Sequence, residues 1–178
     1  GLSGVERKCS QDDFIYDQRP VMVATNAFGM GIDKSNVRYV THYNMPQSLE
    51  NYYQEAGRAG RDGERAECIL LYSPQDVMIN RFLMENKEQN SEYTQEDNAA
   101  VRERDEARLQ VMTHYCTTTE CLREYILRYF GESGGGCCGN CLNCLREYEE
   151  TDVTEAAKKI IAGIREAKQR YGINVIAG

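Results

Sequence analysis

The sequence predicts an α/β layer followed by an all-helical region, and three observations support this fold class. Short apolar runs alternate with a helical pattern as far as Tyr72. From there to Gly131 no segment has the pattern of a strand. Five of the eight cysteines lie between Cys121 and Cys144, inside the helical region. The 178 residues are enough for one domain or two small ones, and an apolar content of 41% can supply a core.

The first 72 residues are predicted to form a polar, weakly helical stretch that ends at Arg19-Pro20, then strands of a parallel sheet with one helix between them. The apolar run at residues 21–25 lies between Pro20 and a glycine-rich stretch, which is typical of a strand buried on both faces. Further strands are predicted over 37–43 and 66–72, with a helix between them from the N-cap Ser48 to about Ala56. Such alternation indicates an α/β architecture. Because the chain starts at Gly1 and not at Met, we expect it to be a piece of a longer protein.

Capping patterns predict two helices in the region that follows. Ser73 as N-cap, with Pro74 next, begins the first of them. Thr117 and Glu120 have the spacing of a capping box for a second helix, which runs through Phe130 and ends at Gly131. The apolar face of the first helix is expected to consist of Val77, Met78, Phe82 and Leu83.

A last helix is predicted from the capping-box pair Asp152 and Glu155 to Gly172, and it holds the most basic stretch of an acidic chain. The net charge of −7 argues against a nucleic-acid partner, but over half of it lies within 84–108, which we interpret as a solvated helix face. Residues 158–170 hold five bases against one acid, and these bases could meet phosphates. They lie opposite an apolar stripe of Ala157, Ile160, Ile161 and Ile164.

The spacing of the cysteines predicts a structural metal site. Cys138, Cys141 and Cys144 follow one another at i, i+3 in a glycine-containing loop, which can bring three thiolates together. Cys121 is the best candidate for a fourth ligand, because the first turn of a helix favours the thiolate. Weaker candidates are Cys137 and Cys116. Four sulfurs leave no open position, as in structural zinc sites.

Two other interpretations of the cysteines stay open. An iron–sulfur cluster is one, although the x₃-Cys-Pro continuation of the ferredoxin motif is missing after Cys144, which favours zinc. A redox role for free thiols is the other. No stretch approaches the ~20 apolar residues of a membrane span, and no signal-peptide pattern is present. Clustered cysteines without a secretory signal favour a reducing compartment, so we expect a cytosolic protein with no membrane partner.

Two loops have the composition of phosphate-contacting segments. In QEAGRAGRDG at 54–63, Arg58 and Arg61 each follow a glycine, which lets a phosphate approach the backbone. Arginine pairs alone are common on surfaces, but these glycines and Gln54 favour phosphate contact. ATNAFGMGID at 24–33 follows the first predicted strand, where open α/β sheets bind ligands. It lacks the G-K-[ST] of a Walker A motif, and its single G-x-G is a weak signal.

Together these stretches resemble RecQ-family DNA helicases of superfamily 2. VATNAFGMGIDKSNVR resembles motif V, YYQEAGRAGRDG resembles motif VI, and Cys121, Arg123, YFGE and CGNCLNC resemble the zinc-binding subdomain, in the family's order. The resemblance runs across almost the whole chain. It implies a partial second RecA-like lobe over 1–72, a helical zinc-binding subdomain over 73–150, and the first helix of a truncated winged-helix domain over 151–178.

The resemblance also implies roles for residues that act on ATP. Arg58 and Arg61 are expected to reach the γ-phosphate of ATP held on the first lobe, with Gln54 linking nucleotide state to DNA. Asp33 is expected to contact the sugar of the nucleotide. Gly29 and Gly31 would shape the loop beside it.

DNA and zinc contacts are implied in the same way. Thr25 would touch the DNA backbone, and Lys158 and Lys159 belong to the basic cluster that matches the opening helix of the winged helix. The zinc ligands implied by the resemblance are Cys121, Cys138, Cys141 and Cys144, with Cys137 as an extra cysteine.

The implied function is ATP-driven 3′-to-5′ DNA unwinding in recombination and repair, by a cytoplasmic, nucleoid-associated protein of bacterial type. Its partners would be DNA at junctions of single strand and duplex, and ATP with Mg²⁺ shared with a first lobe. The chain has no Walker A lysine and no acidic motif II, so we expect it alone neither to hydrolyse ATP nor to unwind DNA. The alternative is a zinc-stabilised DNA-binding or scaffold module without motor activity.

Overall fold

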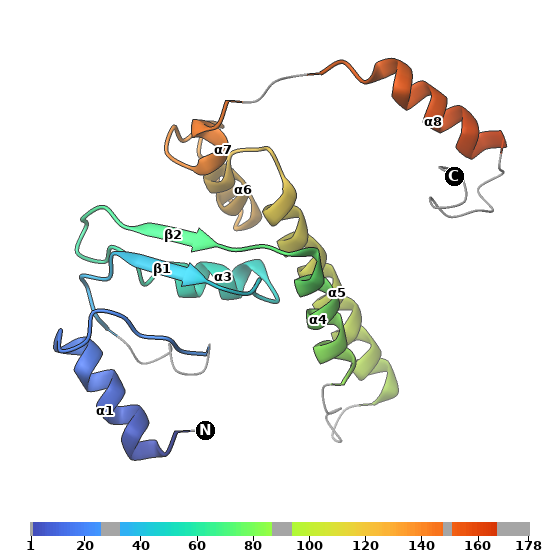
Figure 1. The fold of residues 1–178 in the computed structure, drawn as a ribbon. Helices are drawn as coiled ribbons and strands as arrows, with labels where there is room; N and C mark the ends of the chain where they lie inside the picture. The colour runs from blue at the N-terminus through green and yellow to red at the C-terminus, as the bar shows by residue number, and fades with distance from the viewer. Residues whose placement is uncertain (1, 26–32, 87–93, 148–150, 167–178) are drawn as a thin grey trace. The chain divides into compact units, whose positions relative to one another are not determined.

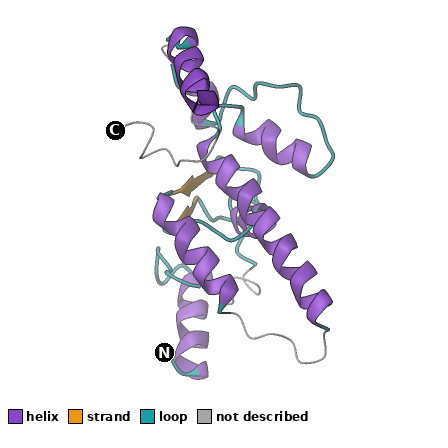
Figure 2. Cartoon of the chain, turned by 90° about the vertical axis from the view of Figure 1, so that its right-hand side faces the viewer, coloured by secondary structure: helices purple, strands orange, loops and turns teal. Residues whose placement is uncertain are grey.

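A computed structural model describes residues 2–25, 33–86, 94–147 and 151–166 of the chain. In order along the chain, the elements are α1 (Gly4–Ile15), β1 (Tyr39–His42), α3 (Leu49–Ala56), β2 (Glu67–Leu70), α4 (Pro74–Glu85), α5 (Gln95–Thr117), α6 (Leu122–Tyr129), α7 (Leu142–Leu145) and α8 (Thr154–Glu166) (Figure 1). They form two compact units, Gly1–Cys144 and Leu145–Gly178. Figure 2 shows that helices dominate and that the strands are short, so the predicted mixed α/β class with a helical second part is confirmed.

The first unit contains a two-stranded parallel sheet within its described residues. β1 pairs with β2 in the register Tyr39↔Glu67 to His42↔Leu70, with α3 as the crossover. Ser48 caps α3 by accepting a hydrogen bond from the backbone N–H of Asn51. The strands predicted over 37–43 and 66–72 and the helix beginning after Ser48 are therefore confirmed, with shorter strands than expected.

The strand predicted over residues 21–25 is wrong. This segment has no regular secondary structure, and Val23 is 95% exposed. A strand buried on both faces needs a paired neighbour and a covering layer on each side. Within the described residues the sheet consists of β1 and β2, so the apolar run has neither.

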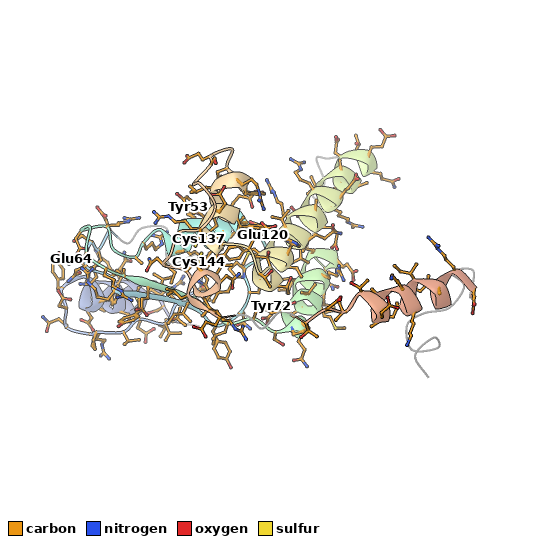
Figure 3. All side chains as sticks on the ribbon, turned by 90° about the horizontal axis from the view of Figure 1, so that it is seen from above. Tyr53, Glu64, Tyr72, Glu120, Cys137 and Cys144 are labelled. Atoms are coloured by element: carbon orange, nitrogen blue, oxygen red, sulfur yellow. The ribbon has the colours of Figure 1, made fainter. Side chains whose placement is uncertain are left out.

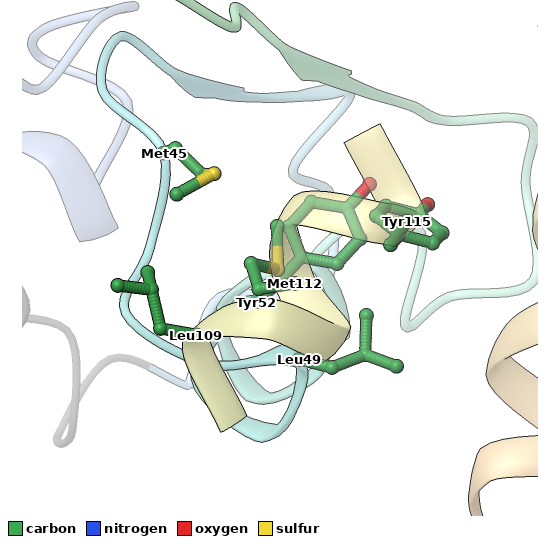
Figure 4. Close-up of a cluster of buried hydrophobic side chains, with 6 residues drawn as sticks. All are labelled: Met45, Leu49, Tyr52, Leu109, Met112 and Tyr115. Atoms are coloured by element: carbon green, nitrogen blue, oxygen red, sulfur yellow. The ribbon is translucent and has the colours of Figure 1, made fainter. Parts of the chain in front are cut away.

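The core of the first unit lies between α3 and α5 (Figure 4). Leu49 from α3 and Leu109 and Met112 from α5 are fully buried. The other buried members are Met45, Tyr52 and Tyr115. On each helix they recur three residues apart, which places them on one face. This contact joins the strand region to the long helix that precedes the cysteines.

Helix α4 begins as predicted, but its predicted apolar face is largely wrong. Ser73 and Asp76 form the capping box, and Val77 packs against the core. In contrast, Met78, Phe82 and Leu83 are exposed. The buried residues of α4 are instead the polar Asp76 and Asn80, which bond to the loop before α3. Asp76 accepts from the backbone N–H of Met45, and Asn80 donates to the carbonyl of Met45.

The predicted start of α6 is also wrong. Thr117 is the last residue of α5, and Cys121 is the N-cap of α6, accepting a hydrogen bond from the backbone N–H of Glu124 at 3.5 Å. Thr118 accepts the backbone N–H of Glu120 instead, so the predicted capping box does not form. The helix stops near Gly131, whose φ of +84° favours glycine.

The second unit contains α8, which follows an Asp152 carboxylate that accepts the N–H of Thr154 at 2.8 Å. Its stripe residues Ile160, Ile161 and Ile164 are exposed. The predicted end at Gly172 lies outside the described residues. Among the helices that the structure describes, none has the length and apolar character to cross a membrane.

Candidate zinc centre and arginine turn

Four cysteine sulfurs converge at the start of α6 and around α7. The Sγ atoms of Cys121, Cys138, Cys141 and Cys144 all lie within 4.8 Å of one another. Two of the Sγ–Sγ distances are 3.9 Å, from Cys141 to Cys121, and 4.0 Å, from Cys138 to Cys144. Tetrahedral Zn²⁺ with Zn–S bonds near 2.3 Å separates its sulfurs by about 3.8 Å. The four residues, hereafter the cysteine cluster, therefore fit a zinc ion.

Backbone amides point at the sulfurs of the cysteine cluster. The N–H of Leu122 donates to Sγ of Cys141 at 3.4 Å, and the N–H of Cys141 donates to Sγ of Cys138 at 3.3 Å. The N–H of Glu124 likewise donates to Sγ of Cys121. These three donors favour thiolates over thiols. The side-chain amide of Asn143 adds a brace by donating to the carbonyls of Thr118 and Glu120 at 2.8 and 2.7 Å.

Glu124 organises the glycine-rich loop that leads to the cluster. Its carboxylate accepts the backbone N–H groups of Gly134 and Gly136 at 2.7 and 3.4 Å. A Cβ atom at Gly134 would stand 2.6 Å from this carboxylate and from Leu127. A larger residue at this position would therefore displace the ends of the Glu124 and Leu127 side chains. Glu124 and Asn143 do not belong to the cysteine cluster but hold the segments that carry it. The sequence prediction missed them, because their partners are backbone atoms.

The thiols of the cluster differ in acidity. Burial raises the pKa of Cys141, but hydrogen bonds from the backbone of Cys144 and Leu122 outweigh it and lower the pKa to about 6. For Cys144, a hydrogen bond with Cys137 is the largest of several effects that raise the pKa to about 12. Figure 3 shows these two residues close together. Four negative sulfurs cannot share this space without a cation, so the cluster retains protons until a metal binds.

Within the described residues, an ion pair joins the motif V loop to the motif VI loop. Arg61 donates from Nη1 to Oδ1 of Asp33 at 2.9 Å, and its Nε donates to the carbonyl of Gly57 at 3.4 Å. The segment 57–63, hereafter the arginine turn, follows directly on α3. The N–H of Gly60 donates to the carbonyl of Val37 at 2.9 Å, which fixes the turn beside β1. Gly60 has a φ of +64°, and a Cβ there would lie 2.9 Å from a backbone oxygen.

The remaining predicted site residues are distributed as follows. Gln54 is exposed on α3, and Thr25 is exposed in the irregular segment before residue 26. Gly29 and Gly31 lie outside the described residues. Lys158 and Lys159 are exposed on α8 in the second unit, where Lys158 pairs with Glu155 at 2.8 Å.

Comparisons with known proteins match both halves of this arrangement. The family model described as the helicase conserved C-terminal domain matches residues 1–63. The model described as RecQ zinc-binding matches residues 74–145, which include the whole cysteine cluster. The chain belongs to the RecQ helicase family. The cysteine cluster and this RecQ zinc-binding match together establish a structural zinc site.

Individual RecQ relatives cover nearly all of the chain. The ATP-dependent DNA helicase RecQ of Bacillus subtilis is 46% identical over 99% of this chain and 28% of its own length. That of Pasteurella multocida is 38% identical over 99% of this chain and 26% of its own length. The RecQ-like DNA helicase BLM of Xenopus laevis is 38% identical over 93% of the chain and 12% of its own length. The chain thus spans about a quarter of the length of these bacterial relatives.

Two buried basic side chains near the RecQ motifs, His42 and Lys34, were not predicted from the sequence. His42 of β1 shares a 2.7 Å hydrogen bond, Nε2 to Oε2, with Glu55, three residues before Arg58. Lys34, next to Asp33, reaches Asp17 at 2.7 Å and the carbonyl of Ile15 at 3.2 Å. Both are less than a tenth exposed. Their positions within or beside the motifs are the only sequence signal that could have indicated them.

Proposed function

We propose that the chain is the rear motor lobe and zinc platform of an ATP-dependent helicase that unwinds DNA in the 3′-to-5′ direction during recombination and repair. The names of the bacterial relatives support ATP-dependent DNA helicase activity for the full-length protein. In this proposal ATP and Mg²⁺ are shared with a first RecA-like lobe. Arg58 and Arg61 stabilise charge on the transferred γ-phosphoryl group, as arginine fingers do.

The observation that carries the proposal is the 2.9 Å contact between Arg61 and Asp33. It brings residues of motif V and motif VI, 28 positions apart in the sequence, into direct contact. Asp33 has a 92% exposed side chain, so it can exchange its partner at little cost. We propose that Asp33 contacts the ribose when nucleotide binds, which releases the Arg61 guanidinium for phosphate. We also propose that Gln54 links nucleotide state to DNA and that Gly29 and Gly31 shape the motif V loop.

We propose Cys121, Cys138, Cys141 and Cys144 as the zinc ligands. These four sulfurs would hold the ion, which would supply structure and not catalysis. The cysteines would thereby join the start of α6 to the loop that contains α7. An iron–sulfur cluster or reactive free thiols would fit the RecQ zinc-binding match less well.

The DNA contacts are proposed at Thr25 and at Lys158 and Lys159, with junctions of single-stranded and duplex DNA as the preferred substrate. Lysines of an exposed helix face bind the phosphate backbone without sequence preference, so this binding should weaken with salt. A cytoplasmic, nucleoid-associated location of the bacterial type follows from this proposal. The second candidate, a zinc-stabilised scaffold module without motor activity, has only the exposed apolar side chains of α4 in its favour.

The test is substitution of the motif VI arginines in the full-length protein. Arg58→Ala and Arg61→Ala should each lower DNA-stimulated ATP turnover by about 10²-fold or more, because each removes charge stabilisation at the phosphoryl group. Arg65→Ala is the matched control, since Arg65 is 86% exposed and pairs only loosely with Glu67. Unchanged turnover in both variants would favour the scaffold module. The 178-residue chain alone should show no ATP hydrolysis.

A further inference from the structure

The first turn of helix α3 contacts both α5 and α6, and α6 begins at Cys121 of the cysteine cluster. Glu50 accepts a hydrogen bond from the Tyr129 hydroxyl of α6, with an O–O distance of 2.7 Å. The same oxygen, Oε1, lies 3.4 Å from Nε of Arg108 on α5. Glu50 and Tyr129 are 79 residues apart in the sequence. One carboxylate therefore joins three helices.

The charge on Glu50 strengthens this junction. Partial burial would raise the pKa of Glu50, but the Tyr129 hydroxyl, its own backbone amide, Ser48 and Arg108 together lower the pKa below its ordinary value. The carboxylate is therefore ionised at neutral pH, and its hydrogen bond with Tyr129 is charge-assisted. A carboxylate in the first turn of a helix is also stabilised by the helix dipole.

An aromatic contact extends the junction by one turn of α3. Tyr53 packs against Phe130 with ring centroids 4.9 Å apart, and Phe130 meets Tyr129 edge-on at 5.2 Å. Tyr53 is labelled in Figure 3. On the adjacent face of the helix, about 100° away, buried Leu49 and Tyr52 pack against α5. Contacts on both faces leave α3 little freedom to rotate or slide.

The other end of α3 leads directly into the arginine turn. The N–H groups of Gly57 and Arg58 bond to the carbonyls of Tyr53 and Glu55, so the turn continues from the last residues of the helix. Glu55 is tied to the buried His42 of β1. A shift of an eight-residue helix therefore moves the guanidinium groups with it.

We infer that Glu50 and Tyr129 are positioning residues for the motif VI arginines, through which the zinc-binding subdomain sets the placement of Arg58 and Arg61. This inference rests on the proposed helicase function. It assigns to the zinc-binding subdomain a second effect, on ATP turnover, that does not require contact between that subdomain and the nucleotide.

The experiment compares two tyrosines of α6 in the full-length protein. Tyr129→Phe removes the hydroxyl that meets Glu50 and should lower kcat for DNA-stimulated ATP hydrolysis about three- to tenfold, which is part of the effect of one charge-assisted hydrogen bond. Zinc content and the KM for ATP should stay near those of the unaltered protein. Tyr125→Phe is the matched control, because its hydroxyl donates to the Val111 carbonyl of α5 and not to α3. Its kcat should be unchanged.

Glu50→Gln completes a double-mutant cycle. If the two side chains act through one hydrogen bond, Glu50→Gln combined with Tyr129→Phe should lower kcat no further than the worse single variant. Additive losses, equal losses in Tyr125→Phe, or loss of zinc in Tyr129→Phe would overturn the inference. So would full turnover in both single variants while Arg61→Ala is inactive. Full turnover in Arg61→Ala would instead overturn the proposed function itself.

Discussion

The cysteine cluster and the arginine turn are both sites for charged ligands, yet they are built in opposite ways. Three of the four cysteines lie within seven consecutive residues, and backbone amides already point at their sulfurs. In the arginine turn, Arg61 pairs with an exposed carboxylate, Asp33, from the other motif. The cluster is organised around the position of its ion. In the arginine turn, the charge of Arg61 is neutralised by Asp33, which a phosphate could replace.

The proposed functions of the two sites account for this difference. A structural metal site stabilises one conformation. Ligands close together in the sequence and hydrogen bonds that brace their loop, such as that from Asn143 to the Thr118 carbonyl, are sufficient for this. A nucleotide site must change state in each cycle, and an exposed ion pair of about 0–1 kcal/mol can be broken and remade cheaply. In the proposed function, the zinc site therefore supplies fixed geometry. The contacts of α3 with α5 and α6 would transmit that geometry to the arginine turn.

The largest expected effect is loss of the zinc ion. Cys141→Ser removes one of four thiolates and should abolish stoichiometric zinc, since apparent binding energies of structural zinc reach about 10–16 kcal/mol and depend on the full ligand set. Elemental analysis measures the zinc, and thermal unfolding measures the accompanying loss of stability. Cys137→Ser, at the exposed neighbouring cysteine, should keep one zinc per chain. An iron signal or a brown chromophore in the unaltered protein would contradict the assignment.

The core between α3 and α5 connects the arginine turn to the cysteine cluster, so its disruption should destabilise both. Leu109→Ala at a fully buried site should lower the free energy of unfolding by about 2–5 kcal/mol. Chemical denaturation of the zinc-loaded chain gives this value. Leu83→Ala, at a half-exposed position of α4, serves as the control and should cost far less. Equal losses from the two variants would mean that the α3–α5 core is not the main source of stability.

Zinc affinity should rise with pH, because zinc binding releases thiol protons. Cys141, with a pKa of about 6, is ionised before zinc binds at neutral pH, while Cys144, with a pKa of about 12, must lose its proton on binding. Each proton released raises the affinity about tenfold per pH unit between these values. Competition with a chromophoric chelator at pH 6.5, 7.5 and 8.5 measures the slope. A flat profile would show that no thiol proton is lost on binding.

The smallest effect is expected at the exposed ion pair. Asp33→Asn should change the free energy of unfolding by less than about 1 kcal/mol, because both partners are accessible to water. Asp76→Asn makes the same chemical change at a buried carboxylate that accepts the backbone N–H groups of Ser73 and Met45, and it should cost about 1–3 kcal/mol. If Asp33→Asn destabilised the chain as much as Asp76→Asn, the ion pair would be a structural bond and not an exchangeable one.

Local rules predicted the parts of this chain that depend on local chemistry. The caps Ser48 and Ser73 and the strand pair β1 and β2 were predicted because their signals lie within a few residues. Local rules failed where tertiary contacts determine which residues are buried. The run at 21–25 has no neighbouring strand in the described residues, and Met78 and Phe82 of α4 face outward while Asp76 is buried. Apolar character alone does not tell which face of a helix is covered.

The sequence by itself determined the family, the motifs and the set of cysteines that could bind zinc, because motif order and i, i+3 spacing are properties of the chain. Tertiary structure alone decided which of those residues meet. It placed Cys121 as the N-cap of α6 beside the other three sulfurs, paired Asp33 with Arg61, and set Glu50 against Tyr129. These contacts join residues 17 to 79 positions apart, except within the cysteine loop. Tertiary packing brings such distant groups together, as the α3–α5 core does for the helix that carries Glu50.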